Sequence, residues 1–313
     1  MVEDAAQSLQ WIETERVHAQ KTMPLVEPIG NGMARVHLSA CKNISSQTLN
    51  RVFVQNSSKA RGSANEFYDA LNILNDLIQS GRTPFVRADA EAYLREYLRG
   101  GIRAVSHSDA FHASYRPAYR VMPEQYARLL ELLSRLDGLL AAGRRVVLAI
   151  DGQCAAGKTT TAESLREWYA CEVIPMDAFF LPPHMKTDAR RAEIGGNIHY
   201  ERFIEEVGAG LCRGGAFAYR PYACAQQALL APVMVSSVPL VIVEGSYSLH
   251  EKLRHLYDVT VCMEIDSQTQ YERLALRENA DSLARFQSTW IPLENAYFEA
   301  NDCKAFCDFS IRT

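Results

Sequence analysis

The stretch RRVVLAIDGQCAAGKTTT, residues 144–161, decides the fold of the larger part of this chain of 313 residues. It opens with a short apolar run rich in valine, which predicts a buried strand at 144–150. Residues 152–159 then match the pattern G-x-x-x-x-G-K-[ST]. A helix is expected to follow, from about residue 158 to 168. A strand, a glycine-rich turn and a helix in this order form a loop that can bind phosphate.

This turn suits the triphosphate of a nucleotide. Its glycines let backbone N–H groups point inward at the phosphates, and the N-terminus of the following helix adds positive potential. Lys158 can place its charge on the β- and γ-phosphates, and the Thr159 hydroxyl can bind Mg²⁺. The sequence therefore predicts ATP and Mg²⁺ as cofactors; an ordinary strand–turn–helix unit with an accidental lysine is the alternative. The predicted nucleotide-binding residues are Gly152, Gln153, Cys154, Ala155, Ala156, Gly157, Lys158, Thr159 and Thr160.

Strands and helices alternate after this turn. Short apolar runs predict further strands at 171–176, 239–245, 257–265 and 305–311. Helices are expected between them, at 200–212, 267–279 and 281–300. Strands that are apolar on both faces are typical of parallel sheets covered by helices. We therefore predict an α/β fold, a parallel sheet with helices on both faces.

The residues before the turn have a different character. Leucines at helical spacing predict a helix over 123–143, which would connect an N-terminal domain of residues 1–122 to a P-loop domain of residues 144–313. Within the N-terminal domain, strands are expected at 35–41, 51–55, 84–89 and 102–108, and helices at 63–81 and 89–101. These elements predict a smaller α/β or α+β domain, whose family and role the sequence does not reveal. Its polar and aromatic segment 106–121 is interpreted as a contact surface between domains, with a second ligand site as the alternative.

Composition and charge exclude several classes of protein. The chain is 48% apolar and 22% charged, as is typical of soluble globular proteins, and its formal net charge is −4. Because no long run of Lys or Arg breaks this mild acidity, neither nucleic acid nor an anionic membrane is expected as the main partner. The acidic, polar start and the absence of any stretch of 18 apolar residues predict a cytoplasmic protein. The eight scattered cysteines are expected to be reduced and mostly buried thiols, and the formation of a homo-oligomer is left open.

Three further features bear on the reaction. Asp177 follows the second strand, where a carboxylate can accept a proton from a substrate hydroxyl; a turn or helix-cap Asp is the alternative. Glu244 ends a buried apolar strand and could stabilise Mg²⁺ together with Thr159, or else pair with a local Arg. Arg273 and Arg277 lie four residues apart on a predicted helix, where they can offset charge on a phosphoryl group or form a solvated helix face.

These segments carry a resemblance to a known family. In order along the chain, DGQCAAGKTT (151–160), PMDAFF (175–180), YRPY (219–222), LVIVEGSYSL (240–249) and RLALR (273–277) resemble the uridine kinase family of P-loop kinases, which is related to phosphoribulokinase and bacterial pantothenate kinase. The resemblance covers about residues 144–313. It implies a doubly wound parallel sheet with a lid. It also implies transfer of the ATP γ-phosphoryl group to a hydroxyl of a small molecule, often a nucleoside.

The resemblance also implies roles for individual residues. Asp177 resembles the catalytic Asp of the family, Glu244 matches its strand-end acid, and Arg273 and Arg277 match its lid arginines. With Lys158, these residues give the predicted catalytic set Asp177, Lys158, Arg273 and Arg277, and the metal ligands Thr159 and Glu244. The predicted substrate-binding residues are Phe179, His199, Tyr200, Arg220 and Tyr222.

Two departures from the family pattern concern the acceptor. Ala223 follows Tyr222 where the family has an Asp, and His199 stands where the family has another acid. A histidine cannot bind a ribose diol as a carboxylate does. The departure therefore counts against uridine or cytidine as the substrate more than it counts against kinase activity. Arg190 and Arg191 suggest an acidic group on the acceptor, or else a solvated loop.

The sequence thus predicts an ATP- and Mg²⁺-dependent phosphotransferase that acts on a small-molecule hydroxyl. The first alternative is a nucleotide-dependent regulatory NTPase whose N-terminal domain binds a partner. The second is a degenerate kinase fold that acts as a scaffold, against which the intact Lys158, Thr159, Asp177 and Glu244 argue.

Overall fold

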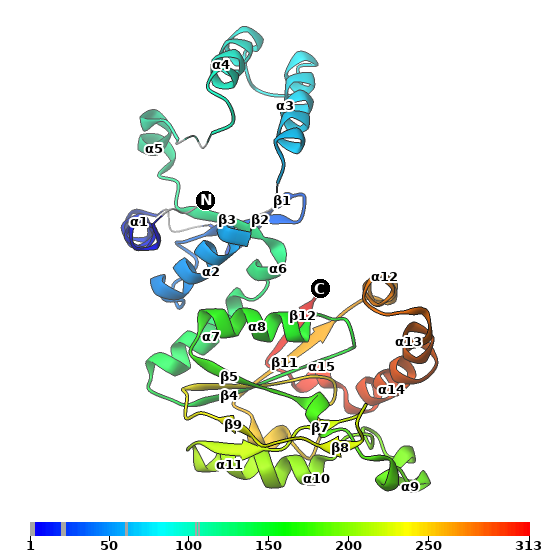
Figure 1. The fold of residues 1–313 in the computed structure, drawn as a ribbon. Coiled ribbons are helices and arrows are strands. Elements are labelled where there is room, and N and C mark those ends of the chain that lie inside the picture. Colours follow the sequence, from blue (N-terminus) through cyan, green and yellow to red (C-terminus); the bar gives the residue numbers. More distant parts are fainter. Residues whose placement is uncertain (1–3, 20–22, 60–61, 104, 106) are drawn as a thin grey trace. The chain divides into compact units, whose positions relative to one another are not determined.

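The computed structural model describes residues 4–19, 23–59, 62–103, 105 and 107–313, which divide into two compact units (Figure 1). The larger one, here called the P-loop unit, comprises residues 41–48 and 124–313. The N-terminal unit comprises the residues up to Ala40 together with Leu49–Pro123. The division into an N-terminal domain, a connecting helix and a kinase domain stays a prediction.

A five-stranded parallel sheet lies at the centre of the P-loop unit. Its strands are β4 (Val146–Gly152), β5 (Cys171–Pro175), β10 (Leu240–Glu244), β11 (Val259–Glu264) and β12 (Phe309–Arg312). Their order in the sheet is β12-β11-β4-β10-β5, and every pairing is parallel. From β4 the chain runs to one side for β5 and β10, and then to the other side for β11 and β12. In such an open sheet, ligands bind at the carboxyl ends of the strands, where the order reverses.

Helices cover both faces of this sheet. Figure 1 shows α7 (Leu130–Ala141) and α8 (Lys158–Trp168) on one face, and α10 (Tyr200–Phe203) with α11 (Ala209–Arg213) on the other. A π-helical turn, Ile204–Gly208, joins α10 to α11. The predicted α/β class is therefore confirmed.

The remaining elements of the P-loop unit connect the strands. Between β11 and β12 the chain forms α12 (Ser267–Arg277), α13 (Ala280–Arg285), a π-helical turn (Phe286–Trp290), α14 (Ile291–Asn301) and α15 (Cys303–Phe306). Between β5 and β10 lie α9 (Asp188–Ala192) and two short ribbons, β6 (Phe217–Tyr219) with β9 (Val233–Val235), and β7 (Tyr222–Ala223) with β8 (Ala228–Leu229). The helix α6 (Glu124–Ala127) precedes α7.

The two central strands explain why this part of the chain is so apolar. β4 and β10 are buried along their whole length. On one face of the sheet, Val147 and Val241 pack in the same cluster as Phe203 and Val207 from the α10–α11 layer. Each such fully buried side chain contributes roughly 1.5–3 kcal/mol through the hydrophobic effect. This burial holds the strand ends, and the loops that follow them, in fixed positions.

The end of β4 passes close to β11 at Gly152. A Cβ atom on Gly152 would lie 2.3 Å from the carbonyl oxygen of Met263, and its φ of 151° is one that residues with side chains rarely adopt. Only glycine therefore fits at the first position of the P-loop.

The N-terminal unit is an α+β structure. Its antiparallel sheet has the order β1 (Val26–Gly30), β2 (Met33–His37) and β3 (Tyr119–Pro123). Its helices are α1 (Ala5–His18), most of α2 (Ser46–Lys59), α3 (Ala64–Gln79), α4 (Arg87–Arg99) and α5 (Asp109–Tyr115). The predicted helix at 63–81 is confirmed, and Ser63 and Glu66 form a capping box at its start.

Three predicted strands in this unit are wrong. Residues 51–55 belong to α2, because Leu49, Val52 and Asn56 are buried at helical spacing although the segment is rich in β-branched residues. Residues 84–86 form a loop with Phe85 and Val86 exposed, and residues 87–89 are the first residues of the helix α4. The described residues of 102–108 form no strand, and Ala104 and Ser106 lie outside the described residues.

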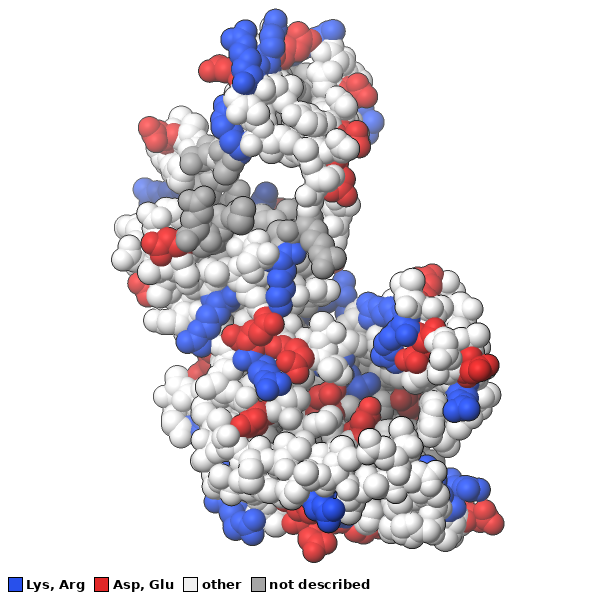
Figure 2. Space-filling model, viewed as in Figure 1, with Lys and Arg blue, Asp and Glu red and all other residues white. Residues whose placement is uncertain are grey.

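Other expectations concern the surface and the cysteines. All eight cysteines are free, although Cys212 and Cys224 are exposed. On the face drawn in Figure 2, basic and acidic side chains are interspersed over both units. Among the described residues, no helix is long and apolar enough to cross a membrane.

Replacing Gly152 with alanine should destabilise the P-loop unit by about 1–3 kcal/mol, because the new Cβ must displace the backbone of β11. Chemical denaturation measures this change. The control is Gly138→Ala on α7, where nothing lies within 4 Å of the new Cβ and a gain of roughly 0.5–1 kcal/mol is expected. Equal stability of Gly152→Ala and the wild type would contradict the close approach.

Candidate active site

The P-loop follows β4 as a turn of unusual backbone conformation. Ala155 and Gly157 have positive φ angles of 63° and 84°, and α8 begins directly afterwards at Lys158. The first N–H groups of a helix have no partner within it, so this end can bind an anion. This backbone conformation is compatible with phosphate binding, and the nucleotide-binding role of the turn stays a prediction.

Lys158 is buried against the loop that precedes it. Its Nζ donates to the carbonyl oxygens of Gly152 (2.7 Å) and Gln153 (2.9 Å) and to Ser246 Oγ (3.2 Å). These three contacts use all three N–H groups of the ammonium. A phosphate oxygen can therefore bind Lys158 only by replacing one of them.

Thr159 and Glu244 meet at the carboxyl ends of β4 and β10. Thr159 Oγ1 donates to Glu244 Oε2 at 3.2 Å, and Glu244 is only 6% exposed. Burial raises the pKa of the Glu244 carboxyl, while Lys158 and the Thr159 hydroxyl partly offset this effect. A hydroxyl and a buried carboxylate suit Mg²⁺, which binds few protein oxygens and relies on phosphate and water for the rest. Within the described ranges, no group of three or more His, Cys, Asp or Glu side chains offers a site built from protein ligands alone.

Asp177 lies beside these groups on the next strand end. Pro175 pairs in register with Glu244, and Asp177 follows two residues later in the 3₁₀ turn Met176–Phe179. Its carboxylate is exposed and has no hydrogen-bond partner in the described part of the chain. Desolvation by the surrounding protein raises its pKa, and the charge of Lys158 opposes the rise. An accessible, unpaired carboxylate near the P-loop lysine is a group that can accept a proton.

The two arginines of α12 take different positions. Arg273 Nη1 donates to the carbonyl oxygen of Ala155 in the P-loop (3.0 Å). Arg277 pairs with Glu278 at 2.8 Å, and its charge acts on Asp177. Both side chains are exposed, and their role toward the phosphates stays a prediction.

Two buried carboxylates near the P-loop were missed in the sequence. Asp151 is fully buried, and burial raises its pKa to about 6 although it accepts several hydrogen bonds. Glu294 of α14 accepts a hydrogen bond from Cys154 N (2.7 Å) and one from Ser246 Oγ (2.8 Å). The sequence signal for Asp151 was a charged residue at the end of an apolar strand. Glu294 has no local signal, because its partners lie 140 and 48 residues away.

The predicted substrate-binding residues do not form one surface. Phe179 is fully buried in the core, with its ring centroid 4.9 Å from that of Phe203, so its predicted contact with substrate is not supported. Arg220 is exposed and its Nε donates to the carbonyl oxygen of Leu230 (3.3 Å). Tyr222 is 8% exposed, and its buried hydroxyl has no hydrogen-bond partner among the residues that the structure describes.

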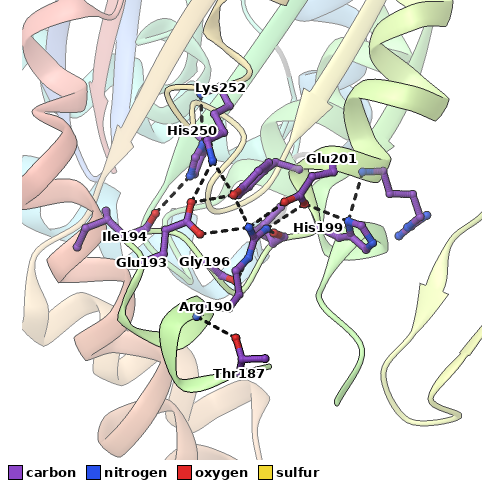
Figure 3. Close-up of polar contacts among 12 residues, drawn as sticks. Thr187, Arg190, Glu193, Ile194, Gly196, His199, Glu201, His250 and Lys252 are labelled. Carbon is purple, nitrogen blue, oxygen red and sulfur yellow. Dashed lines mark hydrogen bonds and ion pairs between the residues drawn. The ribbon is translucent and has the colours of Figure 1, made fainter. Parts of the chain in front are cut away.

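His199 belongs to a separate polar cluster with Arg190 and Glu201, drawn in Figure 3. Tyr200 packs in the same cluster. Arg190 lies over the ring of Tyr200 and donates to both carboxylate oxygens of Glu201 (2.9 and 3.0 Å). It also donates to Glu193 Oε2 at 3.1 Å, and Lys252 Nζ donates to the Tyr200 hydroxyl at 2.6 Å. Arg190 is thus held by internal partners and is unsuited to bind an acidic acceptor. The cluster fixes the segment before α10 instead.

Several solved structures are similar to part of this chain. No protein-family model matches the chain. Among solved structures, it is similar to a possible uridine kinase from Bacillus stearothermophilus, with 20% sequence identity and a TM-score of 0.41, over 58% of this chain and 99% of that one. It is also similar to a putative fructose transport system kinase from a Silicibacter species (21% identity, TM-score 0.42, 56% of this chain and 97% of that one).

A third similar structure is a shikimate kinase from Acinetobacter baumannii, with 15% identity and a TM-score of 0.30, over 56% of this chain and 87% of that one. The resemblance to uridine kinase-like P-loop kinases, which the sequence motifs indicate, is thus also found among solved structures. At these identities and TM-scores it says nothing about a substrate, so the function rests on the site residues themselves.

Glu244→Gln should weaken the binding of ATP in the presence of Mg²⁺ by about tenfold or more, because it removes the charge that faces the cation. Calorimetric titration with ATP, in Mg²⁺ and in EDTA, measures the difference between the two conditions. Glu251→Gln, on an exposed side chain in the segment after the same strand, is the control. If Mg²⁺ strengthened ATP binding equally in both variants, Glu244 would not serve the metal.

Proposed function

We propose that this protein is an ATP- and Mg²⁺-dependent phosphotransferase that moves the γ-phosphoryl group to a hydroxyl of a small molecule. The observation that carries the proposal is the position of Asp177, an exposed and unpaired carboxylate next to the strand end that bears Glu244 and under the influence of Lys158. A carboxylate at this place can accept the proton of an attacking hydroxyl group, and the acceptor screen described below decides whether that group belongs to an alcohol or to water.

The P-loop residues would bind and orient the triphosphate. The backbone N–H groups of the turn and of the first turn of α8 would hold its oxygens, and Lys158 would exchange Ser246 for a phosphate oxygen. Thr159 and Glu244 would hold Mg²⁺, which supplies positive charge between the β- and γ-phosphates. Arg273 and Arg277 would then approach from α12 and offset charge as the phosphoryl group moves.

Asp177 would act on the acceptor. Its ionised carboxylate would accept the proton of the acceptor hydroxyl while that oxygen attacks the γ-phosphorus and the bond to the β-phosphate oxygen breaks. The products are ADP and a phosphate ester. Since Asp177 has no competing partner within the described residues, its oxygen atoms are free to face the substrate.

The residues on the acceptor side match the uridine kinase pattern less well than the residues on the nucleotide side do. Tyr222 and His199 stay candidates for acceptor contacts, and a nucleoside is one candidate class. The unpartnered Tyr222 hydroxyl offers one hydrogen bond. The absence of acids at His199 and Ala223 argues against recognition of a ribose diol by carboxylates.

A regulatory NTPase is the alternative. It would account for the N-terminal unit, which the proposed reaction does not use. It predicts ATP hydrolysis that no small alcohol stimulates, so an acceptor screen separates the two.

Asp177→Asn should bind ATP with Mg²⁺ nearly as the wild type does and lower phosphoryl transfer by about 10²- to 10⁴-fold, which is the usual effect of losing a general base. The measurement is release of ADP that depends on the acceptor, across nucleosides, sugars, sugar phosphates and pantothenate-like alcohols. Asp188→Asn, an exposed Asp at the start of α9, is the matched control. Full activity of Asp177→Asn with the acceptor would refute the assigned role.

Acidification should also lower the rate, and the decline should begin at a higher pH than it would with an ordinary aspartate as the base. A base must be ionised, and desolvation raises the pKa of Asp177, so kcat/KM for the acceptor should decrease as pH falls, starting at a higher pH than the pKa of an ordinary aspartate would give. Titrating ATP binding over the same pH range separates this effect from protonation of Glu244. A rate that is constant down to pH 4, with ATP still bound, would contradict the proposed base.

A further inference from the structure

Glu294 is a buried charge that the proposed reaction does not use. It lies in the first turn of α14 and is 6% exposed. Its Oε2 accepts from Cys154 N at 2.7 Å, and its Oε1 accepts from Ser246 Oγ at 2.8 Å. A buried carboxylate is costly unless such partners compensate for lost water, so its position is specific.

Through Ser246, Glu294 is linked to the P-loop lysine. Lys158 Nζ donates to Ser246 Oγ at 3.2 Å, and the hydroxyl of Ser246 in turn donates to Glu294. A buried cation and a buried anion are thus connected through one hydroxyl group. The negative charge of Glu294 offsets the positive charge of Lys158 while the lysine has no phosphate to bind.

Glu294 also fixes the backbone of the P-loop, together with α12. Gln270 of α12 donates to the carbonyl oxygen of Cys154 at 3.0 Å, and Glu294 accepts from the N–H of the same residue. Beside them, Gln153 Nε2 donates to Asn295 Oδ1 at 3.1 Å. Cys154 of the P-loop is therefore hydrogen-bonded to both α12 and α14, the two helices on either side of α13 and the turn at 286–290.

We propose that Glu294 is a positioning residue for phosphoryl transfer, which acts through Cys154 and Ser246 to hold the P-loop and Lys158 in the geometry that receives the triphosphate. It touches neither substrate directly. When the triphosphate arrives, Lys158 exchanges Ser246 for a phosphate oxygen and keeps its two backbone contacts. Since Cys154 is held from both sides, the loop does not shift during this exchange, and α12 with its two arginines stays in register with the phosphates.

The inference rests on the proposed use of ATP, and two variants test it. Glu294→Ala removes both hydrogen bonds and should raise the dissociation constant of ATP with Mg²⁺ roughly ten- to a hundredfold, the usual effect of losing hydrogen bonds to a charged group. Glu294→Gln keeps an oxygen for Cys154 N and should restore most of the affinity. Glu299→Gln, on the exposed face of the same helix, is the control and should bind ATP as the wild type does.

A second readout distinguishes positioning from a general loss of stability. The charge of Glu294 raises the pKa of Asp177, so Glu294→Gln should move the acidic limb of the pH–rate profile to lower pH, whereas Glu299→Gln should not. Wild-type ATP affinity in Glu294→Ala would overturn the proposal, as would a Glu294→Gln variant that binds ATP no better than Glu294→Ala. If the wild type binds ATP but phosphorylates no acceptor, the proposed function fails, and the ATP affinities alone still decide the role of Glu294.

Discussion

A single buried carboxylate, Asp151, joins the segments on which the site depends. It accepts hydrogen bonds from Gly152 N (2.7 Å), at the start of the P-loop, and from the N–H groups of Tyr247 (3.0 Å) and Leu249 (2.8 Å), beyond β10. The hydroxyl of Tyr297 on α14 donates to it as well, at 2.8 Å. Burial raises its pKa to about 6, and its hydrogen-bond donors oppose this rise because they favour the ionised form. Loss of this one side chain would release three segments together.

Hydrogen bonds to Asp151 help to fix the positions of the groups around it. Tyr247 has a φ of 73°, which is strained for a bulky residue, and its bond to Asp151 helps to hold it there. Its neighbour Ser246 thereby reaches both Lys158 and Glu294. The P-loop, the end of β10 and α14 thus form one hydrogen-bonded unit around the lysine. Preorganised groups of this kind stabilise a transition state without rearranging during the reaction.

Local sequence patterns predicted the elements of the P-loop unit well, and long-range contacts poorly. The strand, turn and helix at 144–168 follow from apolar runs and glycines, each of which acts within a few residues. The segment 51–55 was misread as a strand, because β-branched residues favour strands while its burial follows a helical period. Arg190 illustrates the same limit in the site. Its charge suggested an acidic acceptor, yet Glu193 and Glu201 pair with it. Glu193 stands three residues further on, a spacing that allows such a pair on a helix, but no local pattern indicates the contact with Glu201.

The central claim is that the γ-phosphoryl group of ATP passes to an organic hydroxyl. The most direct test is to incubate the full chain with γ-labelled ATP, Mg²⁺ and a mixed pool of small alcohols, and to find where the label goes. The account predicts label in a phosphate ester, formed at the rate at which ADP appears. Label found only in inorganic phosphate, at a rate that the alcohols do not change, would contradict it and would indicate a nucleotide hydrolase.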